Sequence, residues 1–285
     1  MPIKFSIELT FKHKSKNFFI IKPDILHGFF FNLLPQEIAK NFHKPSKYKP
    51  FCIWTPKIFK FYQSSGLEDE EDISKKLTVT ISFLKDELFS PFLFELTEKR
   101  KNLFLGPYKV SILQKPGSLI KNDEYMTFED FFNIEPKTYL YFQAITPISF
   151  KKGQIDYPLP DPQIFFKSLI KKWNYFSPFR VEVDLRKVLE EKLCVVYSKI
   201  RTYKIHLSLG SAVTGFKGKV VFYGKGLTAE ELKWLNIFGH FSRFAGVGRK
   251  TTMGLGMVEF VSLNHEELSR EEEVFSEANL PNRTP

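Results

Sequence analysis

The residues of this 285-residue chain with the clearest potential for chemistry lie close together near its C-terminus, in the segment 246–256. Four of the chain's 15 glycines fall there, with two cations and two hydroxyls between the glycine pairs. Glycine permits positive φ angles and lets a ligand approach the backbone, and successive exposed amides form concave anion sites. We therefore predict a phosphate-binding loop. Its candidate binding residues are Gly246, Gly248, Arg249, Lys250, Thr251, Thr252, Gly254 and Gly256.

The spacing of this segment differs from that of a nucleotide-binding P-loop. A P-loop requires glycine directly before its lysine and a helix directly after its Ser/Thr, whereas Arg249 precedes Lys250 here. Residues 253–261 alternate between apolar and polar as a strand does. Upstream, Thr228 is suited to cap a helix that runs to Ala245. A tight turn with a glycine helix cap is the structural alternative, but it would explain only one or two of the glycines.

The charge of the chain favours a polyanionic partner. The chain has 42 Lys and Arg against 32 Asp and Glu, which gives a formal net charge of +10. Residues 263–285 form an acidic tail with six Glu and two Arg, so residues 1–262 carry about +14. Nucleic acid is the first expectation for such a basic body, and a lysine-rich solubilising surface is the alternative.

The histidines and cysteines do not predict a metal site. The chain has six histidines, none spaced with a carboxylate as metal ligands would be, and Cys52 and Cys194 form no zinc motif. We therefore expect no metal and no cofactor. RNA can still be cut by its own 2′-hydroxyl if one group removes a proton and another protonates the leaving oxygen, and histidine suits both tasks.

Of the six, His43 is the best placed for this role. It is expected to end a short helix, whose dipole would favour the charged imidazolium, and to begin a loop that contains three lysines and Tyr48. The structural alternative is an ordinary exposed loop histidine. His27, followed by Gly28 and three phenylalanines, is equally compatible with a packed helix position.

Two successive sets of elements are expected to position these groups. Alternating apolar residues predict strands over residues 3–11, 77–85 and 108–115, and an apolar run predicts a buried strand over 51–54. Helices are expected to begin near Asp24 and Asp86. The same order of elements follows after residue 138. This β-α-β-β-α-β order predicts an α+β fold of two tandem ferredoxin-like (RRM-like) domains. We expect these at 1–137 and 138–262, with a basic cleft between them.

The segment GVGRKTTMGLGMVEF resembles the C-terminal signature of CRISPR-associated endoribonucleases, which cut precursor CRISPR RNA within its repeats. The resemblance implies a catalytic histidine after the first domain's helix, which matches His43, and a lysine a few residues later, which matches Lys47 or Lys49. Members of the family often have a tyrosine on that helix. None stands there in this chain, so His27 is the reserve candidate for the second proton carrier.

The resemblance implies a metal-independent endoribonuclease that leaves a 2′,3′-cyclic phosphate and a 5′-hydroxyl. The alternative is a non-catalytic RNA-binding subunit of a CRISPR effector complex, which would share the fold and the glycine-rich loop. RNA is the expected partner in both cases. No signal peptide and no apolar run long enough to cross a bilayer are evident, so the expected location is the cytoplasm, with no membrane partner. The oligomeric state cannot be predicted from the sequence.

Overall fold

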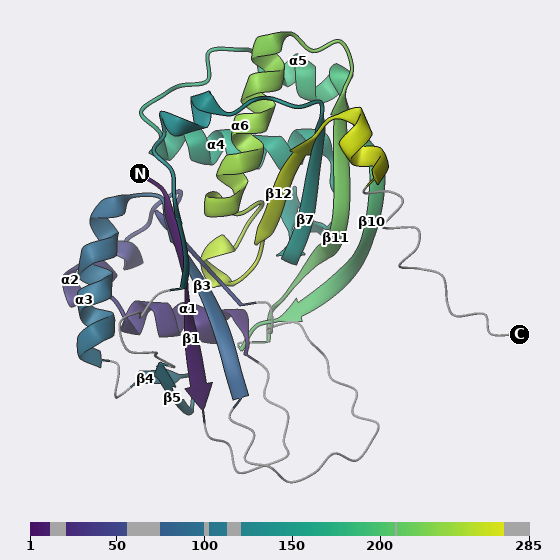
Figure 1. Cartoon of the computed structure of the whole chain (residues 1–285). Coiled ribbons are helices and arrows are strands. Elements are labelled where there is room, and N and C mark those ends of the chain that lie inside the picture. Colours follow the sequence, from purple (N-terminus) through teal and green to yellow (C-terminus); the bar gives the residue numbers. More distant parts are fainter. Residues whose placement is uncertain (12–20, 56–74, 100–102, 113–120, 209, 271–285) are drawn as a thin grey trace, which may run out of the picture.

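The computed structural model describes residues 1–11, 21–55, 75–99, 103–112, 121–208 and 210–270. These residues form two main antiparallel sheets that follow one another along the chain, each packed against its own helices, and a separate two-stranded sheet (Figure 1). The elements of the first half are β1 (Ile3–Phe11), α1 (Pro23–Asn32), α2 (Gln36–His43), β2 (Phe51–Trp54), β3 (Lys75–Phe83), α3 (Phe89–Lys99), β4 (Leu103–Leu105), β5 (Tyr108–Ile112) and β6 (Lys121–Tyr125).

The second half begins with β7 and ends with the glycine-rich loop and β12. Its elements are β7 (Tyr139–Ile148), β8 (Phe150–Lys152), β9 (Ile155–Tyr157), α4 (Pro162–Phe176), α5 (Leu185–Lys187), β10 (Leu193–His206), β11 (Ala212–Gly224), α6 (Ala229–Ala245) and β12 (Val258–Leu263).

The two main sheets have the same strand order. In the first, the path is β2-β3-β1-β5-β4, and β6 also pairs with β1. In the second, the order is β10-β11-β7-β12. The first strand of each set therefore lies inside its sheet and pairs with the third strand of that set. These pairs are β1 with β3 and β7 with β11, and the pairings of β1 with β6 and β7 with β12 are antiparallel as well. The predicted α+β fold with two tandem ferredoxin-like units is confirmed.

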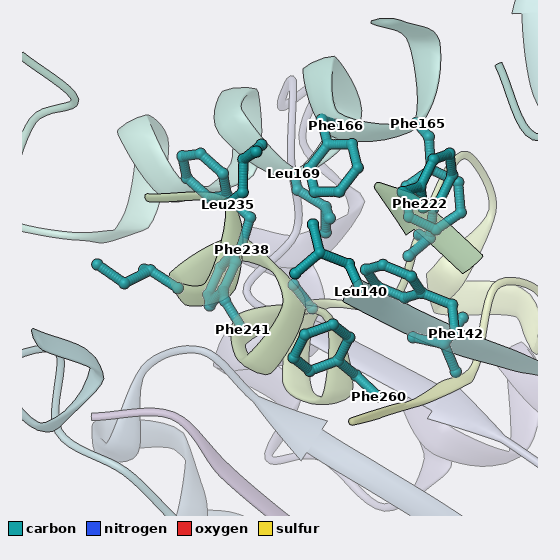
Figure 2. Packing of buried hydrophobic residues seen from close by; sticks show 14 of the residues in the cluster. Leu140, Phe142, Phe165, Phe166, Leu169, Phe222, Leu235, Phe238, Phe241 and Phe260 are labelled. Atoms are coloured by element: carbon teal, nitrogen blue, oxygen red, sulfur yellow. The ribbon is translucent and has the colours of Figure 1, made fainter. Parts of the chain in front are cut away.

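A separate apolar core lies between each sheet and its helices. The first contains Phe5, Phe30 and Phe92, which are fully buried. The second is unusually aromatic, and Figure 2 shows rings from strands and helices meeting in it. The ring of Phe142 on β7 lies 4.8 Å from that of Phe165 on α4. Much of the phenylalanine content therefore builds cores, as aromatic side chains of this size commonly do.

Several predicted boundaries are corrected by the structure. The strand expected over 253–261 begins only at Val258, because residues 251–253 form a short 3-10 turn and the following residues continue the loop. The helix expected to begin at Asp24 begins at Pro23. The Asp24 carboxylate accepts a hydrogen bond from the amide of Ser208 instead of capping the helix. By contrast, Thr228 caps α6 in a complete capping box, as expected.

Contacts between the halves join the two sheets into one body. The indole nitrogen of Trp54 on β2 donates to the carbonyl of Leu255, at 2.9 Å. Arg243 on α6 forms a 2.7 Å ion pair with Glu124 on β6. The end of the first unit's edge strand is thereby held against the loop that follows α6. The division at residue 137 into separate domains stays a prediction.

Candidate functional site

A pocket of about 290 Å³ lies where the loop after α2 meets the glycine-rich loop, residues 246–256. The first half contributes Lys47, Tyr48 and Lys49 to its lining, and the second half contributes residues from α4 and from the glycine-rich loop. Among the described residues that line the pocket there are five cations and no carboxylate. These cations are Lys47, Lys49, Lys172, Arg249 and Lys250. The two segments that the sequence singled out are therefore brought together by the fold.

The glycine-rich loop is held mainly by its own backbone and by neighbouring strands. The amide of Val247 donates to the carbonyl of Gly256, and the amide of Gly256 donates to Pro147. The Gly248 amide donates to the hydroxyl of Ser168. The expectation of a row of exposed amides is thus wrong at these positions, because the amides fix the shape of the loop. These three amides are therefore already used within the protein and are not available to a phosphate.

Close backbone packing explains two of the glycines. Gly248 has φ +78°, and a Cβ there would lie 2.4 Å from the carbonyl oxygen of Ser149. Gly256 has φ +76°, and a Cβ there would lie 2.1 Å from the carbonyl oxygen of Val247. Both positions combine a left-handed backbone with a contact that only glycine allows. The close approach is to the protein's own main chain.

The two loop cations have different surroundings. Arg249 forms a 2.7 Å ion pair with Asp156, so much of its charge is already balanced. Lys250 has a left-handed backbone with φ 58° and its ammonium lies 3.5 Å from the sulfur of Met253. Burial, with Arg249 adding to the effect, lowers the pKa of Lys250 below its usual value. A bound anion would therefore stabilise the charged form of Lys250 more than that of Arg249.

The two threonines of the loop, Thr251 and Thr252, have different surroundings. Thr251 is buried, and its hydroxyl lies 3.4 Å from the ammonium of Lys172. Thr252 is only partly buried and uses its carbonyl oxygen to contact His27. Both line the pocket. Gly246 and Gly254 also have positive φ angles, 62° and 95°, so these two predicted binding residues turn the chain at each side of the cationic segment.

The loop after α2 supplies the other side of the pocket. His43 is the last residue of α2, as predicted, and its side chain lies outside the described part of the structure. Lys49 donates to the carbonyls of Phe42 and Lys44, so it caps the C-terminal end of α2. Lys47 is exposed, with its ammonium 5.9 Å from the centre of the Tyr48 ring. Of the two lysines matched to the family's lysine, Lys47 is the more open to solvent.

His27 contacts the glycine-rich loop from α1. Its Nδ1 lies 2.6 Å from the carbonyl oxygen of Thr252. Because a carbonyl can only accept, this nitrogen carries the hydrogen. The imidazole also packs at 4.7 Å from the Phe31 ring. His27 is thus a packed helix residue that also supports the loop, and its role as the reserve proton carrier stays a prediction.

Two further residues complete the support of the loop, a role that the sequence analysis predicted for neither of them. The thiol of Cys52 on β2 donates to the carbonyl of Ala245 at 3.0 Å, and burial raises the pKa of this thiol. Lys172 on α4 donates to the same carbonyl at 2.8 Å. These contacts join residues that are at least 70 positions apart in the chain, and no local pattern marks them.

The described residues contain no group of three or more His, Cys, Asp or Glu side chains arranged to hold a metal ion. Within the same part of the chain, no helix combines the length and the apolar character needed to span a membrane.

Comparison with known proteins places this architecture among characterised folds. Residues 142–258 match the family model described as CRISPR-associated endoribonuclease Cas6. No match was found among curated protein sequences.

The solved structures that resemble the chain cover nearly all of it. A Cas6 product complex is 24% identical, with 92% of this chain and 100% of that chain covered and a TM-score of 0.75. For Thermus thermophilus Cas6 the values are 23% identity, 92% and 98% coverage and a TM-score of 0.68. A protein from a Cas6-related gene of Pyrococcus furiosus is 15% identical, with 92% and 99% coverage and a TM-score of 0.58.

Proposed function

We propose that this chain, whose residues 142–258 match the family model of CRISPR-associated endoribonucleases, cuts precursor CRISPR RNA within its repeats without a metal ion. The observation that carries the proposal is the basic pocket. It combines Lys47 and Tyr48, next to the helix that ends at His43, with the glycine-rich loop of the second half. RNA phosphates carry negative charge, which would balance the cations of this lining.

The proposed binding mode uses side chains from both halves. Lys250 and Lys47 would attract backbone phosphates, which contribute affinity but no direct sequence information. Tyr48 offers an aromatic ring at the pocket wall, and its ring lies 5.3 Å from that of Tyr175, which is 52% exposed. Such rings can stack on unpaired bases. The pocket would thus hold the RNA strand by charge and by stacking.

The proposed chemistry is an internal transesterification. The 2′-oxygen of the RNA attacks the adjacent phosphorus as a base removes its proton, and the bond from phosphorus to the 5′-oxygen breaks as an acid donates a proton. The products are a 2′,3′-cyclic phosphate and a 5′-hydroxyl. We assign one proton transfer to His43, with His27 as the reserve candidate, and charge stabilisation of the transition state to Lys47 or Lys49.

The proposal is tested with purified protein and repeat RNA in excess EDTA. We expect cleavage to continue, and we expect it to stop when the 2′-hydroxyl at the cut site is replaced by hydrogen. Analysis of product ends should give the cyclic phosphate and the 5′-hydroxyl. Loss of cleavage on chelation, or cleavage of the 2′-deoxy RNA, would refute the mechanism. Tight binding of RNA without any cleavage would instead identify a non-catalytic RNA-binding subunit of an effector complex.

A further inference from the structure

Lys172 is a buried cation at the centre of the support for the glycine-rich loop. Only 7% of the residue is exposed. Its ammonium donates to the carbonyls of Ala245 and Gly246, at 2.8 Å and 2.9 Å, and lies 3.4 Å from the hydroxyl of Thr251. One side chain on α4 thus connects the end of α6 to the middle of the glycine-rich loop.

The position of Lys172 has a clear electrostatic reason. The last carbonyls of a helix lack partners within the helix and form the negative end of its dipole. Ala245 is the last residue of α6, and both it and Gly246 are buried, so their carbonyls need a donor from elsewhere in the protein. Lys172 provides that donor and a positive charge together.

The charge of Lys172 is not balanced by an acidic side chain among the described pocket residues. The other titratable residues that line the same pocket are Cys52, Tyr48 and four further cations: Lys47, Lys49, Arg249 and Lys250. Burial raises the pKa of both Cys52 and Tyr48, which keeps them neutral near pH 8. Desolvation lowers the pKa of Lys172 to about 8, although the neighbouring Cys52 acts in the opposite direction. A bound anion would supply the missing countercharge.

We propose that Lys172 is a positioning residue of the RNA site: it holds the glycine-rich loop against α6 and places a buried positive charge in the pocket wall. The RNA part of this inference rests on the proposed function. The loop-holding part does not, because it follows from the contacts of Lys172 with Ala245, Gly246 and Thr251. The two parts can therefore be tested separately.

The charge makes a prediction about pH. A phosphate near Lys172 favours the protonated amine and so raises its pKa in the complex. RNA binding then takes up a proton above the free pKa of about 8, and affinity falls as pH rises through that value. If the pKa rises by one unit on binding, affinity falls about fivefold between pH 7 and pH 9. Below pH 7 this contribution is constant.

The test uses the full chain and a matched pair of variants. Lys172→Met removes the charge and the donors but keeps a side chain of similar length. Lys171→Met is the control, because Lys171 is the exposed neighbour on the same helix. Hydrogen exchange is measured at the loop amides of Val247 and Gly256, and affinity is measured from pH 7 to pH 9 with repeat RNA that is 2′-deoxy at the cut site.

In Lys172→Met, but not in Lys171→Met, we expect loop amides to exchange at least about tenfold faster while β1 and β3 are unchanged. RNA affinity at pH 7 should fall roughly tenfold, the size of a one-unit pKa shift, and the decline between pH 7 and pH 9 should become shallower. Unchanged loop exchange would overturn the loop-holding role. A pH profile identical to that of the wild type would overturn the role of the charge.

A second variant and the wild-type pH profile provide two further tests. If Lys172→Met does not fold, Lys172→Gln, which retains hydrogen-bond donors without charge, takes its place. The wild-type pH profile needs no variant, and affinity that stays constant from pH 7 to pH 9 would refute the charge effect. If the wild type binds no repeat RNA, the proposed function fails, whereas the exchange measurement still decides whether Lys172 holds the loop.

Discussion

The proposed chemistry depends at the residue scale on His43, which ends α2 beside the lysines of the pocket. We expect His43→Ala to lower the single-turnover rate of cleavage by roughly 10²-fold or more, the scale of a lost general acid or base. RNA affinity should change little, because a proton carrier contributes mainly to the transition state. Rapid-quench cleavage and equilibrium binding with the same RNA measure the two quantities.

His27→Ala is the natural comparison for that experiment. Because His27 donates to the carbonyl of Thr252, its removal should loosen the glycine-rich loop and weaken RNA binding as well as cleavage. Two results together would assign the proton transfer to His27. His43→Ala would retain the full rate, and His27→Ala would lose cleavage while its RNA binding stayed unchanged.

The two cations of the loop should differ in their effect on binding. Lys250→Ala should weaken binding to matched and mismatched RNAs alike and flatten the slope of log K against log salt by somewhat under about one unit. Arg249→Ala should flatten it less, because Asp156 already balances much of the arginine's charge. Affinity measured over a salt series, at unchanged melting temperature, tests the difference. No change in affinity or slope in either variant would show that the loop does not bind phosphate.

At the scale of the elements, the glycine-rich loop is a rigid connection between α6 and β12. Gly248→Ala should lower the free energy of unfolding by roughly 1–3 kcal/mol, because a left-handed backbone is combined with a Cβ 2.4 Å from the oxygen of Ser149. Gly28→Ala on α1 is the control: it meets no atom within 4 Å and should stabilise its helix by about 0.5–1 kcal/mol. Urea denaturation measures both.

A Gly248→Ala protein as stable as the wild type would contradict the account of the loop as a backbone support. Loss of RNA binding at unchanged stability would be a different result, since it would indicate that RNA itself approaches the main chain at Gly248. The measurement therefore separates a structural glycine from a ligand-binding one.

At the scale of the whole molecule, the open question is where the first unit ends. Phe131 lies before residue 138, yet it belongs to the second core, with its ring 5.5 Å from that of Trp173 on α4. We therefore propose that the second unit begins before Phe128, which is buried in the same core. The boundary predicted at 137/138 would remove both rings from the core that they fill.

Phe131→Ala in the full chain tests this division. The substitution should lower the free energy of unfolding by roughly 3–5 kcal/mol, as for a fully buried phenylalanine. Hydrogen exchange should become faster in β7 and β12 before it does in β1 and β3. Phe94→Ala, at a residue 66% exposed, is the control and should be nearly neutral. Equal loss of protection in both sheets would mean that the halves unfold as one unit.

The sequence determined the parts of this protein that local patterns control. Apolar alternation indicated the strands, Thr228 indicated the start of α6, and the glycine-rich segment indicated the loop and the resemblance to the family whose model matches residues 142–258. These features depend on neighbouring residues, whose hydrogen bonds and φ angles follow from the types present.

Only the tertiary structure decided how the loop is held and which charges remain available. Lys172, Trp54 and Cys52 reach the loop from distant elements, and Asp156 balances Arg249 but not Lys250 to the same degree. The amides of Val247, Gly248 and Gly256 donate within the protein, although the glycine pattern predicted that loop amides would be exposed. The physical reason is that burial and pairing depend on which elements pack together, and residues far apart in the chain leave no periodic signal of that contact.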